Sequence, residues 1–66
     1  MQITLNGQPH PLPDASDIHS LLAALRLTPD KVAVELNRRL VCRESYNTRL
    51  KEADQVEIVT FVGGGV

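Results

Sequence analysis

The residues with the clearest chemical potential stand at the end of the chain, where Thr60 to Val66 read TFVGGGV. Glycine loses more conformational freedom on ordering than any other residue, so three in a row at a terminus are predicted to stay mobile unless a partner binds them. Extended, they reach about 10 Å beyond the last strand. Because they lack side chains, they fit a narrow channel. The sequence therefore favours a carboxylate on a glycine arm that another protein's active site receives.

The other reactive side chains have no partners at a useful spacing. Cys42 is the single cysteine, which excludes an internal disulfide and any metal site that needs two thiolates. His10 and His19 lie in different segments, and either would have to serve as the base if Cys42 were a nucleophile. The three glycines lack the lysine and hydroxyl of a phosphate-binding loop. We expect no catalytic residue, no metal site and no cofactor of the domain's own.

Length and composition exclude several classes of protein. Sixty-six residues make one domain, which buries only about 60% of the surface of its unfolded chain. Two aromatic residues and a net charge of −1 predict no binding to nucleic acid. The N-terminus lacks a basic start followed by an apolar run, and no segment approaches the roughly 20 apolar residues of a membrane span. We expect a cytoplasmic protein that does not bind membranes.

The first half of the chain predicts a hairpin followed by one helix. Residues 1–5 alternate apolar and polar, and the Asn6-Gly7 pair is typical of a tight hairpin turn. Three prolines restrict the returning strand, over residues 8–12, to a sheet edge. Ser16 or Asp17 can cap a helix that has one apolar stripe. Pro29 predicts that this helix ends near residues 26–27. The stripe consists of Ile18, Leu21, Leu22 and Leu25.

The second half predicts strands separated by turns. Residues 32–36 alternate, a turn follows at 37–38, and a short strand resumes at 40–41. Residues 42–54 show no sustained period, although Tyr46 and Leu50 are expected at the edge of the core. Residues 55–62 form the last strand, and the glycine tail covers 63–66. The predicted core consists of Ile3, Leu5, Ile18, Leu21, Leu22, Leu25, Val34, Leu36, Val56 and Ile58.

These elements predict an α+β roll, in which four or five strands wrap one helix. A single helix covers one sheet face, so the other face meets water or a partner. Val59 and Phe61 are expected on that uncovered face, where they would form a docking patch beside the tail. Residues 38–51 carry five basic side chains and one acidic one, so Arg38 and Arg39 are further candidates for docking.

The segments VAVELN at 32–37, RRLVCRESY at 38–46 and ADQVEIVTFVGGG at 53–65 resemble the ThiS family of thiamine-pathway sulfur carriers. MQITLNG and DIHSLLAAL stand where that family has its first strand and helix, so the resemblance covers essentially the whole chain. It implies a β-grasp, ubiquitin-like fold with a mixed sheet over residues 1–62.

The resemblance also implies a function. The terminal glycine carboxylate, on Gly65 after Gly63 and Gly64, would be adenylated with ATP and magnesium by a ubiquitin-activating-type (ThiF-like) adenylyltransferase. A persulfide donor would convert it to a thiocarboxylate, which gives its sulfur to a ThiG-like thiazole synthase. The carrier is then a co-substrate and not an enzyme. Val66 departs from the pattern: either it is removed before activation, or it marks a form that is not activated. Cys42 has no role in the family pattern and should be dispensable.

Two other interpretations stay open. The first is a related carrier that supplies sulfur for molybdopterin, cysteine or tRNA thiolation, although the TFVGGG ending and the short chain favour thiamine. The second is a ubiquitin-like interaction module whose tail has no chemical role. Removal of residues 64–66 separates these classes, because only a carrier loses all function.

Overall fold

The computed structural model describes residues 1–61. The predicted tail over 63–66, its boundary after residue 62 and its predicted mobility lie outside the described residues. Within them, the strands are β1 (Gln2–Leu5), β2 (Gln8–Pro11), β3 (Val32–Leu36), β4 (Arg39–Val41) and β5 (Gln55–Thr60). The helices are α1 (Ile18–Ala24) and two single 3₁₀ turns, η1 (Pro29–Lys31) and η2 (Arg43–Ser45).

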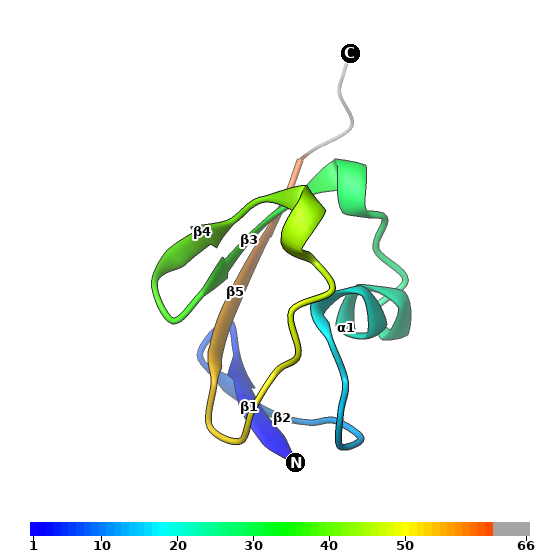
Figure 1. Cartoon of the computed structure of the whole chain (residues 1–66). Helices are drawn as coiled ribbons and strands as arrows, with labels where there is room; N and C mark the ends of the chain where they lie inside the picture. Colours follow the sequence, from blue (N-terminus) through cyan, green and yellow to red (C-terminus); the bar gives the residue numbers. More distant parts are fainter. Residues whose placement is uncertain (62–66) are drawn as a thin grey trace.

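The five strands form one mixed sheet in the order β2-β1-β5-β3-β4, and α1 covers one of its faces (Figure 1). The central pair, β1 and β5, is parallel, whereas the other pairs are antiparallel. β2 lies at a sheet edge, as its prolines predict. The structure confirms the α+β roll with a mixed sheet and one helix, which is the β-grasp fold.

Two tight turns connect the hairpins and also attach them to β5. The backbone φ is positive at both central residues of each turn, at 50° and 82° for Asn6-Gly7 and at 50° and 71° for Asn37-Arg38, as type I′ turns require. The Asn6 side chain accepts a hydrogen bond from the Ile58 N–H (2.8 Å) and donates one to the Ile58 carbonyl (3.2 Å). Asn6 thus extends the short ladder between β1 and β5 beyond the strand's own backbone.

The helix α1 ends earlier than the sequence predicts, at Ala24 instead of near residues 26–27. Arg26 adopts a left-handed conformation with φ of 60°. Its N–H donates to the Ala23 carbonyl (3.0 Å), and the Leu27 N–H donates to the Leu22 carbonyl (2.9 Å). This pair of bonds is a Schellman motif, which usually has glycine at the left-handed position. Because arginine occupies this position, the sequence lacks the glycine that would have predicted the end of the helix.

The arginine at this position predicts a stabilising substitution. A non-glycine residue in the left-handed region costs about 1–2 kcal/mol, and glycine does not carry that cost. After allowance for glycine's greater freedom in the unfolded chain, Arg26→Gly should raise the free energy of unfolding by about 0.5–1 kcal/mol. The matched control is Ala23→Gly, at an exposed helical position, which should lower it by up to about 1 kcal/mol. Urea unfolding measures both, and a loss of stability in both variants would contradict the assignment.

Asp17 is the N-cap residue of α1, and its carboxyl group titrates. Hydrogen bonds from the Ser20 backbone N–H (2.7 Å) and hydroxyl (2.8 Å) to Asp17 Oδ1 hold the pKa of this carboxyl below its ordinary value of 3.8. Because the pKa is lower in the folded state, the stabilisation is complete above the unfolded value and is lost as pH falls through the folded value.

We therefore expect the unfolding free energies of the wild type and of Asp17→Asn to keep a constant difference at neutral pH. Asparagine also caps helices but does not titrate there. Below about pH 4, the wild type should lose stability relative to Asp17→Asn. Denaturant titrations across this range test the expectation. A difference that stays constant down to the lowest pH at which both fold would refute it.

The core lies between α1, the sheet and the segment 42–54. Leu5, Leu25 and Leu36 are only partly buried and pack against its rim, because α1 has seven residues and spans only about 10 Å. The segment 42–54 covers the remaining sheet surface with Tyr46 and Leu50, as predicted. The full buried set is Ile3, Leu12, Ile18, Leu21, Leu22, Val32, Val34, Tyr46, Leu50, Val56 and Ile58.

Candidate functional site

The last described residues anchor the point from which the glycine tail continues. Thr60 pairs with Val32 at the end of the β3–β5 ladder. One residue further, the Phe61 N–H donates to the Lys31 carbonyl (2.8 Å) in η1. Both 3₁₀ turns lie at this end of the molecule (Figure 1). Val62 and the predicted sulfur-carrying residues Gly63, Gly64 and Gly65 follow this anchor and lie outside the described residues.

An apolar patch lies on the uncovered sheet face beside this anchor. Val59 is 61% exposed and Phe61 55% exposed, in agreement with the alternation along the last strand. Leu40 in β4 is 70% exposed and belongs to the same face. It pairs with Glu35, which lies two residues along β3 from Ala33, the partner of Val59. We did not predict Leu40. The two-residue turn between β3 and β4 fixes the register of this hairpin, and that register would have predicted Leu40 on the uncovered face.

Arg38 and Arg39 lie further from the tail than Val59 and Phe61, although Arg39 directly precedes Leu40 in β4. Arg38 occupies the tip of the β3–β4 hairpin, and Arg39 pairs with Leu36. Leu36 in turn pairs with Val56 near the start of β5, at the opposite end of that strand from Phe61. Both arginines are exposed. A docking role for the arginines, as for Val59 and Phe61, stays a prediction.

The remaining reactive side chains are spread over the surface. Cys42 is exposed and immediately precedes η2. His19 makes an edge-to-face contact with Tyr46, with 5.8 Å between the ring centres. His10 lies in β2, where it pairs with Ile3 of β1. Over residues 1–61 there is no group of three or more His, Cys, Asp or Glu side chains placed to hold a metal ion.

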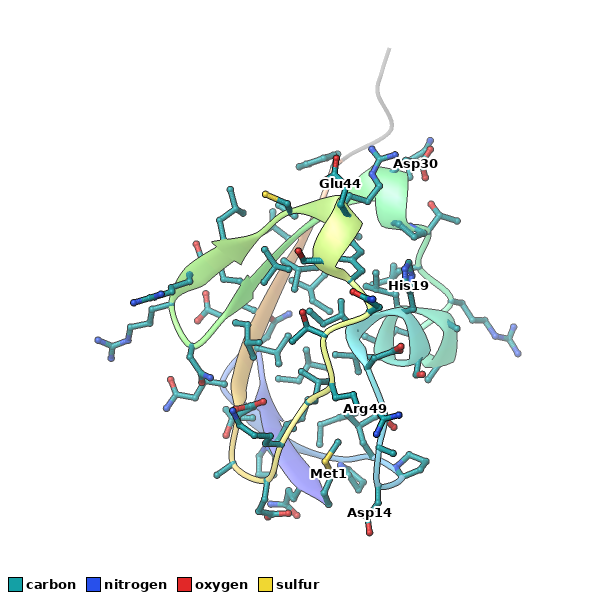
Figure 2. The ribbon with its side chains drawn as sticks, in the orientation of Figure 1. Met1, Asp14, His19, Asp30, Glu44 and Arg49 are labelled. Atoms are coloured by element: carbon teal, nitrogen blue, oxygen red, sulfur yellow. The ribbon has the colours of Figure 1, made fainter. Side chains whose placement is uncertain are left out.

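The two ends of the molecule differ in charge arrangement. Figure 2 shows Asp30 and Glu44 at the end where β5 terminates, with Met1 and Asp14 at the opposite end. The Met1 ammonium group forms an ion pair with Asp14 Oδ1 at 3.1 Å and also donates to the Leu12 carbonyl (2.8 Å). Over residues 1–61, no helix is both long enough and apolar enough to cross a membrane.

Comparison with known proteins assigns the family. The family model for ThiS matches residues 3–65, which includes all three tail glycines and leaves Val66 outside. The chain belongs to the ThiS family. The crystal structure of the thiamine biosynthesis protein ThiS from Geobacter metallireducens superimposes with a TM-score of 0.82 at 36% identity, covering 98% of this chain and 100% of that one.

Curated relatives of this ThiS-family chain fall into two sizes. A thiazole synthase from Magnetococcus marinus is 46% identical over 66 residues, which are 98% of this chain and 20% of that protein. The sulfur carrier protein ThiS of Bacillus subtilis is 42% identical over 53 residues, covering 79% of this chain and 80% of that one. The chain thus spans about a fifth of the length of the thiazole synthases that it matches.

Proposed function

We propose that this protein is a sulfur carrier of thiamine biosynthesis and that Gly65 carries the sulfur on its carboxyl group. The family match that ends at Gly65 carries the proposal. The similarity to a sulfur carrier protein and to a thiamine biosynthesis protein supports it. The carrier acts as a co-substrate, because its contribution is a carboxyl group and a surface that other proteins recognise.

The proposed chemistry has two stages, both in partner active sites. A carboxylate oxygen of Gly65 attacks the α-phosphate of ATP and displaces pyrophosphate, with magnesium and ATP bound by an adenylyltransferase of the ubiquitin-activating type. The terminal sulfur of a persulfide then attacks the acyl carbon and displaces AMP. A second thiol cleaves the resulting acyl disulfide, which leaves a thiocarboxylate on the carrier. Glycine suits both attacks, since no side chain crowds the carbonyl carbon.

The proposed acceptor of the sulfur is a thiazole synthase. Two thiazole synthases contain a segment that is similar to this whole chain, at 46% and 35% identity. A protein that holds a carrier-like segment within its own chain keeps that segment at high effective concentration near its active site. This arrangement supports a functional contact between carrier and synthase when the two are separate chains.

The described domain supplies a fixed base for the tail. The Phe61 backbone bond to Lys31 and the last β3–β5 pair hold the end of β5 in place. From this base, four extended residues reach about 13 Å to the carbonyl of Gly65. The domain body therefore stays outside the partner's channel while the reacting carbon enters it.

Sulfur loading tests the proposal directly. The chain ending at Gly65 is incubated with the adenylating enzyme of the same organism, magnesium-ATP and sulfide, and the intact carrier is weighed for replacement of one oxygen by sulfur. Loading is expected for this chain and for its Cys42→Ser variant, because the acceptor is a carboxyl group. Deletion of residues 64–66 should abolish loading. Absence of loading in every form would leave an interaction module, and loss of loading in Cys42→Ser alone would implicate the thiol.

A further inference from the structure

The turn between β1 and β2 contains a pair of residues that can react with each other. The backbone nitrogen of Gly7, after losing its proton to base, attacks Cγ of Asn6. The Cγ–Nδ2 bond then breaks, ammonia leaves, and a five-membered succinimide ring remains. Water opens this ring at either carbonyl and gives aspartate or isoaspartate. Glycine favours the attack, because no Cβ crowds its nitrogen, and nothing lies within 4 Å of the position that a Cβ on Gly7 would take.

In the folded chain, three hydrogen bonds hold Asn6 on β5 and oppose this reaction. The side-chain oxygen accepts from the Ile58 N–H (2.8 Å), and Nδ2 donates to the Ile58 carbonyl (3.2 Å). The backbone N–H of Asn6 donates to the Val56 carbonyl (2.9 Å). Attack on Cγ changes the geometry of this carbon and detaches Nδ2, so both side-chain bonds to Ile58 must break first.

We propose that Asn6 is a site of spontaneous deamidation that the fold itself protects. The side-chain amide is stable while the β1–β2 turn is attached to β5, and it reacts when this attachment opens. The rate in the folded protein is then the rate in the unfolded chain multiplied by the fraction of molecules that are open. Three hydrogen bonds of ordinary strength keep this fraction at about one in ten or less. This inference is independent of the proposed sulfur chemistry.

The products should weaken the attachment that protected the amide. An ionised aspartate at position 6 only accepts hydrogen bonds, so it cannot donate to the Ile58 carbonyl that Asn6 Nδ2 contacts. Isoaspartate adds a carbon atom to the backbone of a turn whose two-residue length sets the register of the hairpin. Each modified molecule therefore opens more often than an unmodified one. The damage acts on β5, the strand from which the tail continues.

The second hairpin turn of the chain is an internal control. Asn37 also occupies the first central position of a type I′ turn, with φ of 50°. Its side chain likewise accepts from a β5 backbone group, the Gln55 N–H (2.9 Å), and donates to Asp54 Oδ1 (3.1 Å). The following residue is Arg38, whose Cβ crowds the attacking nitrogen. The two turns thus differ mainly in the residue that must react with the asparagine.

The test compares the folded and the unfolded chain at mildly alkaline pH, in buffer and in guanidinium chloride. Peptide mapping by mass spectrometry locates each asparagine whose amide nitrogen has been replaced by oxygen. We expect Asn6 to react at least about tenfold faster in guanidinium chloride than in buffer. Asn37 should react much more slowly than Asn6 in guanidinium chloride. The variant Arg38→Gly should make Asn37 reactive in guanidinium chloride while it stays protected in buffer.

Two results would overturn the proposal. Equal rates at Asn6 in buffer and in guanidinium chloride would mean that the bonds to Ile58 do not protect the amide. A rate at Asn37 of the parent chain that equals the rate at Asn6 would mean that Gly7 does not determine the site. The consequence is tested with Asn6→Asp and with the modified chain after its return to buffer. Both should unfold at a lower denaturant concentration than the parent, and equal midpoints would contradict the predicted weakening.

Discussion

Leu21→Ala is expected to unfold a substantial fraction of this protein at room temperature. Leu21 is completely buried between α1 and the sheet. Truncation of such a leucine removes transfer free energy and leaves a cavity, which together cost about 2–5 kcal/mol. A domain of this length has a total stability of only about 3–10 kcal/mol. The substitution therefore removes a large share of the stability, and little remains to keep β5 paired where the tail is anchored.

The same substitution at Leu40 is the matched control. Leu40 is 70% exposed, so Leu40→Ala should change the free energy of unfolding by no more than about 0.5 kcal/mol. Urea titration followed by far-ultraviolet circular dichroism gives both values, and Leu21→Val extends the series if Leu21→Ala does not fold. Equal losses at the two positions would mean that α1 does not pack on the sheet as described.

Local signals in the sequence predicted most of the fold. The period-2 alternation of β5 and the apolar stripe of α1 each depend on neighbouring residues, and both elements are present, although β5 ends at Thr60 instead of continuing through Phe61. The end of α1 was wrong because Arg26 takes a conformation that usually belongs to glycine. Leu12 was missed for a different reason. It follows an irregular proline-rich strand, and its burial depends on the distant segments that close over it.

The site was predicted less completely, because its surface depends on pairings between distant strands. Val59 and Phe61 follow from alternation within one strand, and the structure confirms that both are exposed. The placement of Leu40 on the same face as Val59 requires the register between β3 and β5, which are separated by the segment 42–54. Asn37 helps to set this register, because its side chain accepts a hydrogen bond from the Gln55 N–H (2.9 Å). No short-range pattern contains that information.

Removal of Val66 is expected to convert a poor substrate of the adenylating enzyme into a good one. In the proposed reaction, the attacking carboxylate must lie in line with the α-phosphate of ATP, and we expect the channel that receives it to be shaped for glycine. A terminal valine moves the carboxylate one residue further and adds a branched side chain that is stiff about χ1. Discrimination against one poorly fitting group of a few carbons is worth about 1–3 kcal/mol. The chain ending at Val66 should therefore be adenylated about ten to two hundred times more slowly than the chain ending at Gly65.

The Val66→Gly variant separates the two contributions to this effect. It keeps the extra residue and removes only the side chain, so it isolates length from crowding. If crowding dominates, Val66→Gly should recover most of the rate of the chain ending at Gly65. If length dominates, Val66→Gly should be adenylated as slowly as the chain ending at Val66. Initial rates of pyrophosphate release, with equal concentrations of the three carriers below KM, give the ratio of kcat/KM directly. Equal rates for all three would show that the channel tolerates both the length and the branch, and the steric argument would then be wrong.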